Sequence, residues 1–194
     1  MQNKLISANT LTSEALYLRY LHGDESGLSA LIERHGDNLT FYINGYIHDF
    51  KQSEDFMIEA FSRLLVKQPF FDERGFKAYL YKIGRNLALS YIKKSRLQPC
   101  FYLEELKYEP GHSDSAEDTL INDELNQIVG KSLGQINPEY REAIYLFYYE
   151  GMSYSEAADV MKKNEKQLAN LIYRGKQALK LLFEKEGITD AKYR

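Results

Sequence analysis

The sequence predicts an all-α fold in which two small helical domains are joined by an acidic flexible linker. Three observations lead to this prediction. Apolar residues recur every three or four positions over most of the 194 residues, and no stretch alternates as a half-buried strand does. Pro99, Pro110 and Gly111 interrupt this pattern within an acidic stretch. Near the C-terminus, two helical segments separated by a three-residue turn have the proportions of a helix-turn-helix.

The first half of the chain contains five predicted helical segments. Their apolar periodicity places them at about 11–22, 24–36, 39–50, 53–68 and 76–91. We expect Gly23 to end the first segment and Gly36 to end the second. Asp24 and Ser53 are expected to cap the second and fourth helices, and Pro69 to close the fourth.

The second half begins after a linker and contains four more predicted helices. They lie at about 121–133, 138–150, 153–161 and 165–185. Asn137-Pro138-Glu139 is a strong helix start, with a capping residue, proline at the first position and an acid next. Ser153 and Glu156 have capping-box spacing. The predicted domains are therefore 13–96 and 120–186, with the linker at 97–119.

The composition is that of a cytoplasmic protein with a packed core. Hydrophobic residues make up 44% and charged residues 27%, which argues against intrinsic disorder. The single cysteine, Cys100, excludes a disulfide framework and a cysteine-rich zinc site. The N-terminal segment lacks the apolar run of a signal peptide, and no stretch approaches the roughly 18 uninterrupted apolar residues of a membrane span. We expect no association with a membrane.

The charge is distributed unevenly along the chain, whose formal net charge is −3. Residues 74–96 contain seven basic side chains and no acid, and residues 162–180 contain six basic side chains and one acid. Between them, residues 96–125 contain two basic and eight acidic side chains, a net charge of −6. Two cationic stretches that flank an anionic one indicate a nucleic-acid partner.

The predicted helix-turn-helix would insert the start of its second helix into the major groove of DNA. Lys166, Gln167 and Asn170 lie there; glutamine and asparagine suit adenine edges, and lysine suits guanine. The side chains expected nearer the phosphates are Lys163, Arg174 and Lys176. An ordinary helical hairpin with a solvated basic face is the alternative interpretation.

The basic stretch 74–96 is interleaved with aromatic residues, a combination that suits single-stranded nucleic acid. These aromatics are Phe76, Tyr79, Tyr81 and Tyr91. The alternative is that they belong to the core beneath an ordinary lysine-rich surface.

Signals for an enzyme are weak, and we expect no catalytic, metal or cofactor site. The four histidines, His22, His35, His48 and His112, fall on different segments without ligand spacing. There is no glycine-rich phosphate loop and no nucleophile elbow. The acids Glu54, Asp55 and Glu59 are interpreted as a solvated helix face that suits a basic partner.

Two blocks of sequence together resemble RNA polymerase sigma factors of the extracytoplasmic-function (ECF) type. The first block contains Gly23-Asp24-Glu25, SEDFMIEAF (53–61) and FKAYLYKIGRNLALSYIKK (76–94). The second contains NPEYREAIYLFYYEGMSYSEAADVM (137–161) and YRGKQALK (173–180). The resemblance covers about residues 13–96 and 120–183, and its specificity comes from two matching blocks in the right order and separation.

The resemblance implies three interfaces. The helix at 53–61 would dock on the clamp helices of the largest subunit of core RNA polymerase, through Asp55, Ile58 and Glu59. The upstream −10 promoter element would be held as a single strand by Lys77, Tyr79, Arg85 and Asn86. The duplex −35 element would be read by the helix-turn-helix, through Lys163, Lys166, Gln167, Asn170 and Arg174. The implied partners are core RNA polymerase and promoter DNA. An anti-sigma factor is a third partner compatible with the resemblance, and no cofactor is expected.

The sequence departs from the family pattern at several positions. Ile58 occupies a position that is usually glutamine, Tyr79 one that is usually tryptophan, and Ser90 one that is frequently aspartate. The segment NEKQLANLIYR (164–174) also lacks the small and basic residues common there, so the resemblance implies no promoter sequence.

A stand-alone helix-turn-helix regulator, with residues 1–96 as a sensor or dimerisation domain, is the alternative function. Such a protein benefits from a broadly positive potential, because phosphate neutralisation supplies most of its non-specific affinity. The net charge of −3 therefore favours the sigma factor.

Overall fold

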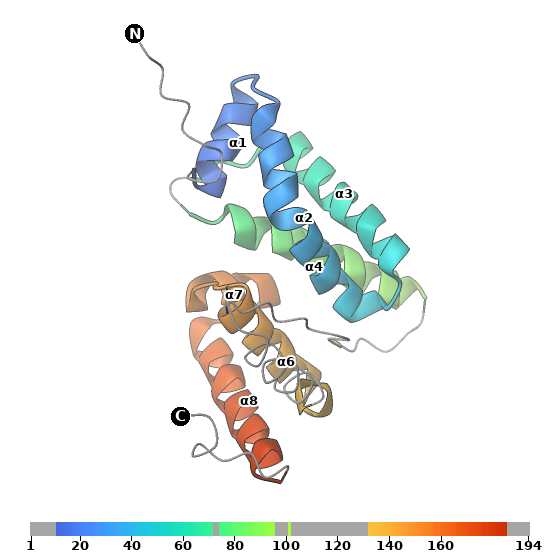
Figure 1. The fold of residues 1–194 in the computed structure, drawn as a ribbon, viewed down its shortest axis with the longest axis vertical. Helices are drawn as coiled ribbons and strands as arrows, with labels where there is room; N and C mark the ends of the chain where they lie inside the picture. The colour runs from blue at the N-terminus through green and yellow to red at the C-terminus, as the bar shows by residue number, and fades with distance from the viewer. Residues whose placement is uncertain (1–10, 72–73, 96–100, 102–131, 186–194) are drawn as a thin grey trace, which may run out of the picture. The chain divides into compact units, whose positions relative to one another are not determined.

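The computed structural model describes residues 11–71, 74–95, 101 and 132–185 (Figure 1). Within these residues all regular structure is helical, which confirms the predicted all-α fold class. Residue contacts divide the chain into two compact units, Met1–Pro99 and Cys100–Arg194. Most of the predicted linker and of the predicted helix at 121–133 lies outside the described residues. None of the described helices is long and apolar enough to cross a membrane.

The first unit is organised around one long central helix, which packs against three others in the described residues (Figure 1). The four helices are α1 (Ser13–Leu21), α2 (Ser26–Ile47), α3 (Phe50–Lys67) and α4 (Phe76–Lys94). Helix α2 contacts all of the others, and α3 also packs against α4. The core between them includes Leu31, Leu39, Ile43, Leu64 and Leu80, all fully buried.

Helix α2 occupies the place where the sequence predicted two helices. The segments expected at 24–36 and 39–50 form one continuous helix, and Gly36 lies buried within it instead of ending it. Leu31 and Leu39, on either side of Gly36, are fully buried in the same core. Their burial, at about 1.5–3 kcal/mol per side chain, outweighs the cost of about 1 kcal/mol for glycine in a helix.

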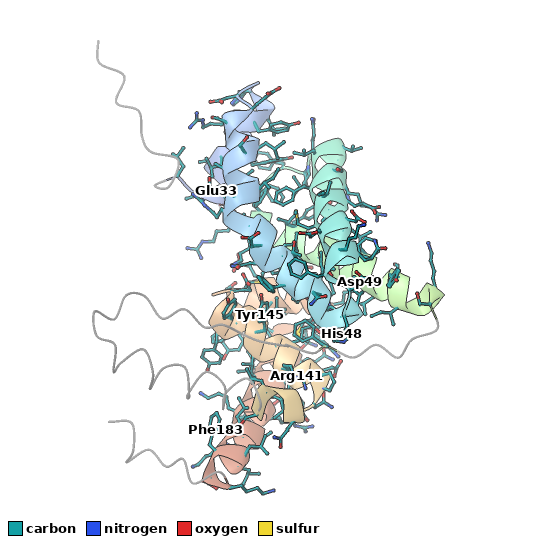
Figure 2. The ribbon with its side chains drawn as sticks, turned by 45° about the vertical axis from the view of Figure 1, so that its right-hand side comes forward. Glu33, His48, Asp49, Arg141, Tyr145 and Phe183 are labelled. Atoms are coloured by element: carbon teal, nitrogen blue, oxygen red, sulfur yellow. The ribbon has the colours of Figure 1, made fainter. Side chains whose placement is uncertain are left out.

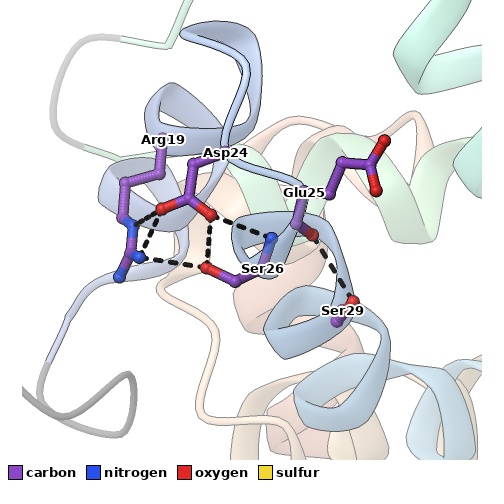
Figure 3. Close-up of polar contacts among 5 residues, drawn as sticks. All are labelled: Arg19, Asp24, Glu25, Ser26 and Ser29. Atoms are coloured by element: carbon purple, nitrogen blue, oxygen red, sulfur yellow. Dashed lines mark hydrogen bonds and ion pairs between the residues drawn. The ribbon is translucent and has the colours of Figure 1, made fainter.

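The turn between α1 and α2 is held by Asp24 (Figure 3). Its carboxylate accepts hydrogen bonds from the Ser26 hydroxyl at 2.6 Å and from the Ser26 backbone N–H at 3.0 Å. It also pairs with the Arg19 guanidinium of α1. The hydrogen bond from Ser26, followed by that from Arg19, lowers the pKa of Asp24 to about 2. Asp24 therefore lies at the start of α2 as predicted, although the cap position itself is Glu25.

Helix α3 begins one turn earlier than predicted, because Asp49 and not Ser53 caps it. The Asp49 carboxylate accepts a hydrogen bond from the Gln52 backbone N–H at 3.0 Å. Ser53 is buried inside the helix, where its hydroxyl donates to the Asp49 carbonyl at 2.7 Å. Figure 2 shows Asp49 beside His48, whose left-handed backbone (φ 54°) ends α2. Glu54 and Asp55 consequently lie beyond the first turn of α3.

The second unit contains the predicted helix-turn-helix. Its described elements are α6 (Pro138–Ile144), the π-helical turn η2 (Tyr145–Tyr149), α7 (Tyr154–Met161) and α8 (Glu165–Lys185). Asn137 caps α6, and Ser153 and Glu156 form both bonds of the predicted capping box. The sequence predicted a regular α-helix up to Gly151, but its last part is the wider π turn. Lys162, with φ 55°, reverses the chain between α7 and α8.

Arg141 is a buried residue whose hydrogen bonds hold the backbone of this unit (Figure 2). The sequence did not predict this role. Only 1% of its surface is exposed, and its guanidinium donates to four backbone carbonyls. These belong to Phe101, Leu133, Gly134 at 2.7 Å and Ile136 at 2.9 Å. The planar fork of an arginine carries five donors, so one side chain can satisfy several carbonyls. Arg141 thereby fixes the turn that leads into α6.

Helix α8 approaches α6 closely at Gly175. A Cβ atom added there would lie 2.7 Å from Cδ1 of Ile144 and 3.1 Å from Cβ of Tyr140. Ile144 belongs to the small core of this unit, against which Leu179 and Leu182 of α8 also pack. A glycine at this point sets how closely α8 lies against its neighbour.

We predict that Gly175→Ala destabilises the second unit. Overpacking of this kind costs about 1–3 kcal/mol, more than the ~1 kcal/mol that alanine contributes as a helix former. Gly134→Ala is the matched control, because no atom lies within 4 Å of the added Cβ. Hydrogen exchange of the α6 and α8 amides measures the difference, and equal protection in the two variants would contradict the close contact.

His35 connects α1 to α2 and lies against the start of α4. It is 6% exposed, its Nε2 atom is 2.7 Å from the Ser13 hydroxyl oxygen, and its ring lies 5.8 Å from that of Phe76. Burial, followed by the charges of Lys77 and Arg34, lowers the pKa of His35 to about 4. The folded protein therefore holds this imidazole neutral at neutral pH.

We predict that the first unit loses stability as the pH falls from about 6.5 to about 4. In that window the unfolded chain binds a proton at His35 and the folded chain does not, so the free energy of unfolding decreases by up to roughly 3 kcal/mol. Denaturant unfolding between pH 4 and 7 tests this, with His35→Gln expected to flatten the dependence. Retention of the full slope in that variant would assign it to other groups. Asp24 acts only below this window.

Candidate nucleic-acid interfaces

Helix α8 has one buried face and one exposed face. Leu168, Ile172 and Gly175 are buried toward the rest of the second unit. The exposed face carries four of the five residues predicted to read the duplex element: Lys166, Gln167, Asn170 and Arg174. Residues on an exposed helix face are accessible to DNA. In a helix-turn-helix, the residues in the first two turns of the second helix are the ones that enter the major groove.

Gln167 has a structural role that the sequence analysis missed. Its backbone N–H donates to Asn164 Oδ1 at 2.8 Å, and its side-chain Oε1 accepts from the Asn164 backbone N–H at 2.9 Å. This reciprocal pair caps the start of α8, in the same way as Ser153 and Glu156 cap α7. The carbonyl oxygen of the Gln167 amide is therefore engaged in this bond, which leaves the NH₂ group outside it. The signal was the Asn-x-x-Gln spacing.

Lys163 lies in the turn before α8 and is tied to α6. Its ammonium group is 2.8 Å from the Glu139 carboxylate, in the first turn of that helix. Lys176, on α8, lies with its ammonium 5.7 Å from the centre of the Tyr148 ring. Both lysines therefore already contact groups within their own unit, whereas sequence reasoning treated them only as phosphate contacts.

Tyr173 is an exposed aromatic residue on α8 that the sequence did not predict to be a site residue. Its side chain is 64% exposed, and it follows Asn170 by three positions, which places the two on one face of the helix. An apolar surface at this place can contact a thymine methyl group. The face available to the groove thus combines Lys166, Asn170, Tyr173 and the amide of Gln167.

Helix α4 carries all four residues predicted to hold a single strand, and each of them is half-buried. These are Lys77, Tyr79, Arg85 and Asn86. Tyr79 packs against the ring of Phe71 with centroids 5.6 Å apart, and the Lys67 ammonium lies 5.6 Å from its ring. The other aromatics of this stretch are partly core: Phe76 and Tyr81 are fully buried, and Tyr91 packs against Phe56.

Two buried tyrosines contact Lys77 and Arg85, namely Tyr81 of α4 and Tyr46 of α2, and the ring of Tyr42 packs against both tyrosines. The Arg85 Nε–H donates to the Tyr46 hydroxyl at 3.1 Å, and the guanidinium carbon lies 5.9 Å from the Tyr46 ring. The Lys77 ammonium lies 5.7 Å from the Tyr81 ring.

The outer face of α3 presents the residues predicted to dock on the polymerase. Asp55 is exposed, and Ile58 keeps 59% of its surface exposed although it is a large apolar residue. The Glu59 carboxylate pairs with Arg63 one turn later, at 2.6 Å. Residues three and four apart are neighbours on a helix, so Asp55, Ile58 and Glu59 form one acidic–apolar face. In the described ranges, no group of three or more His, Cys, Asp or Glu could hold a metal ion.

Two family models match the chain, one in each unit. The model of sigma-70 region 2 matches residues 31–98, and that of sigma-70 region 4 matches residues 126–179. The first match contains most of α2, all of α3 and α4, and the second contains α6, α7 and most of α8.

Curated proteins that resemble the chain include three ECF RNA polymerase sigma factors. BldN of Streptomyces coelicolor is 28% identical over 159 residues, which is 81% of this chain but only 60% of BldN. SigW of Bacillus subtilis is 26% identical over 172 residues, covering 81% of this chain and 89% of SigW. The sigma-E factor of Escherichia coli is 25% identical over 178 residues, covering 87% and 93%.

Two solved structures share the fold. One is CnrH in complex with the cytosolic domain of CnrY, with a TM-score of 0.58, 22% identity, and coverage of 89% of this chain and 97% of that chain. The other is RpoE of Bartonella quintana in complex with the anti-sigma factor NepR, with a TM-score of 0.58, 19% identity, and coverage of 86% and 98%.

Proposed function

The chain belongs to the ECF group of RNA polymerase sigma factors, and from this premise we propose how its two units divide the work of transcription initiation. The first unit would bind core RNA polymerase and the −10 element, and the second would bind the −35 element. The observation that carries this proposal is that both sigma-70 regions occur in order along one chain, each with a helix rich in basic residues. The chain would act in the cytoplasm, and the polymerase would supply the catalysis.

For the core enzyme, we propose that the acidic–apolar face of α3 docks on the clamp helices of the largest subunit. An exposed isoleucine between two carboxylates suits a partner with both apolar and basic groups. Ile58 replaces the usual glutamine of the family, so this contact would rely more on apolar burial.

For promoter DNA, we propose that α4 holds the melted −10 strand and that α8 reads the −35 duplex. Lys77 and Arg85 would contact phosphates, while Tyr79 and Asn86 would contact bases. In α8, Lys166, Gln167 and Asn170 would meet base edges, and Lys163 and Arg174 would lie nearer the backbone.

For regulation, we propose that an anti-sigma factor holds the free protein. The support is the fold shared with a sigma factor that was solved as a complex with an anti-sigma factor.

Run-off transcription with purified core polymerase and a library of promoter fragments tests the function. We expect discrete transcripts that depend on the added chain. Tight, sequence-specific binding of duplex DNA by the chain alone at physiological salt, without transcripts, would instead support a stand-alone regulator.

We predict that the double substitution Asp55→Ala and Glu59→Ala, and separately Ile58→Ala, weakens binding to core polymerase. These side chains lie on the outer face of α3, so their loss should change the free energy of unfolding by less than about 0.5 kcal/mol. Glu33→Ala, at an exposed acid of α2, is the control (Figure 2). A titration of core polymerase in which all variants bind like the wild type would remove α3 from the interface.

We predict different effects for three residues of α8. Asn170→Ala should change the base preference at one position of the −35 element by about 1–3 kcal/mol, whereas Arg174→Ala should weaken all promoters alike and lower the salt slope by about one. Gln167→Ala should both change base preference and destabilise the start of α8 by roughly 1 kcal/mol, because it removes one of the two reciprocal hydrogen bonds that cap the helix. Holoenzyme binding to single-base promoter variants at several salt concentrations measures all three. This arrangement would be refuted if Arg174→Ala changed the base preference at one position while Asn170→Ala left it unchanged.

A further inference from the structure

We propose that Phe101 anchors the predicted linker to the second unit in the free protein, and that this anchor is released when the chain binds both promoter elements. The inference rests on the proposed function, because it needs α4 at the −10 element and α8 at the −35 element. It gives a role to a residue of the predicted linker that neither the sequence pattern nor the resemblance indicated.

The ring of Phe101 is buried in the second unit. Only 1% of the residue's surface is exposed, and its ring centre lies 6.0 Å from that of Tyr145 in η2. Residue contacts assign Phe101 to the same unit, which begins at Cys100. Burial of a phenylalanine ring is one of the largest apolar contributions that a single residue can make to a fold. This part of the predicted linker is therefore fixed to the second unit.

The backbone of Phe101 is held as well as its ring. Arg141 lies on α6, one turn before Tyr145 (Figure 2), and its guanidinium donates to the Phe101 carbonyl. The same guanidinium donates to three carbonyls of residues 133–136. Arg141 is 1% exposed, so water competes little for these bonds, and a charged donor makes them stronger than bonds between neutral groups. One buried arginine thus ties residue 101 to the turn that leads into α6.

The anchor shortens the covalent connection between the two units. Phe101 follows Ser95, the residue after α4, by six positions. A fully extended chain spans about 3.6 Å per residue, so these two residues can be at most about 22 Å apart. Without the anchor, the connection would run from Ser95 to Ser132, and the same limit would be about 130 Å. Both limits hold for any arrangement of the units.

The promoter elements are farther apart than the anchored chain can reach. Their names place them about 25 base pairs apart, which is about 85 Å of straight duplex at 3.4 Å per pair. From Tyr79 to Ser95 the chain covers about 24 Å along α4, and α8, the longest described helix of the second unit, is about 32 Å long. Placed end to end with the short connection, these lengths reach roughly 78 Å. Binding to both elements therefore requires the longer connection, in which Phe101 has left its site.

The anchor would couple the two promoter contacts to the polymerase. In the free chain, burial of the Phe101 ring favours the form with the short connection. Ligands shift such an equilibrium only by their difference in affinity for the two forms. Core polymerase and the two DNA elements, bound together, would supply that difference, because only the form with the long connection can bind them all. Either DNA element alone would leave the anchor in place.

The test lengthens the connection without changing the anchor. A Gly/Ser segment of about ten residues, which adds up to about 36 Å, is inserted between Leu97 and Gln98. The matched control carries the same segment between Ser113 and Asp114, beyond the anchor. At fixed core polymerase and promoter, the chain concentration that gives half-maximal run-off transcription is measured. We expect the first insertion to lower it by roughly 10–150-fold, the factor that corresponds to burial of one phenylalanine, and the control to leave it unchanged.

Phe101→Ala is a second variant, which removes the ring that is released. It should give a gain similar to that of the first insertion, and the two changes combined should give no more than either alone. Because Phe101 is part of a folded unit, thermal unfolding is measured alongside. If Phe101→Ala unfolds the second unit, the two insertions decide the question, since both keep the anchor intact.

The proposal is overturned if the insertion between Leu97 and Gln98 has no effect, or if the two insertions have equal effects. It is also overturned if Phe101→Ala, while folded, keeps the full gain from that insertion. Failure of the wild-type chain to give any promoter-dependent transcript would instead reject the proposed function.

Discussion

In each unit the helix proposed to meet DNA is held by a neighbouring helix that reaches its backbone at a glycine. A Cβ at Gly84 of α4 would lie 2.9 Å from Cδ1 of Leu39 and 3.1 Å from Cδ1 of Ile43, both on α2. At Gly175 of α8, Ile144 of α6 occupies the corresponding space. These two contacts set how deeply α4 and α8 lie in their units, and hence which of their side chains face solvent. A larger residue at either glycine would have to displace these side chains or the helix itself.

The supporting helices also carry residues that fix their surroundings: a side chain of α4 in the first unit, and the turn before α6 in the second. On α2, Leu39 and Ile43 pack against Gly84, and Tyr46, three residues after Ile43, contacts the Arg85 guanidinium of α4. On α6, Ile144 packs against Gly175 while Arg141, one turn earlier, fixes the turn that leads into the helix. In the first unit, the packing of α4 and the orientation of Arg85 thus depend on neighbouring turns of α2.

Local signals were enough to predict the helices and several caps, because a cap is decided within four residues. Asn137 and the Ser153–Glu156 box are where the sequence placed them. The errors arose where burial decided between equivalent signals: Gly36 is buried inside α2 and does not end it, and Asp49 caps α3 while Ser53 is buried within that helix. Arg141 and Tyr46 escaped prediction for the same reason, since each depends on partners that only the tertiary structure brings close.

In the proposed contact with the −35 element, the start of α8 would couple base reading to helix stability. Gln167 caps the helix with the carbonyl of its amide, so a substitution that changes its contact with DNA also removes a bond to the Asn164 backbone. With its carbonyl held at the Asn164 backbone, the Gln167 amide would use its NH₂ group toward acceptors such as guanine O6 or thymine O4. Asn170 and Tyr173 lie on the exposed face beyond the cap. Base preference can therefore change at those two positions at little cost in stability, whereas at Gln167 it is constrained by the fold.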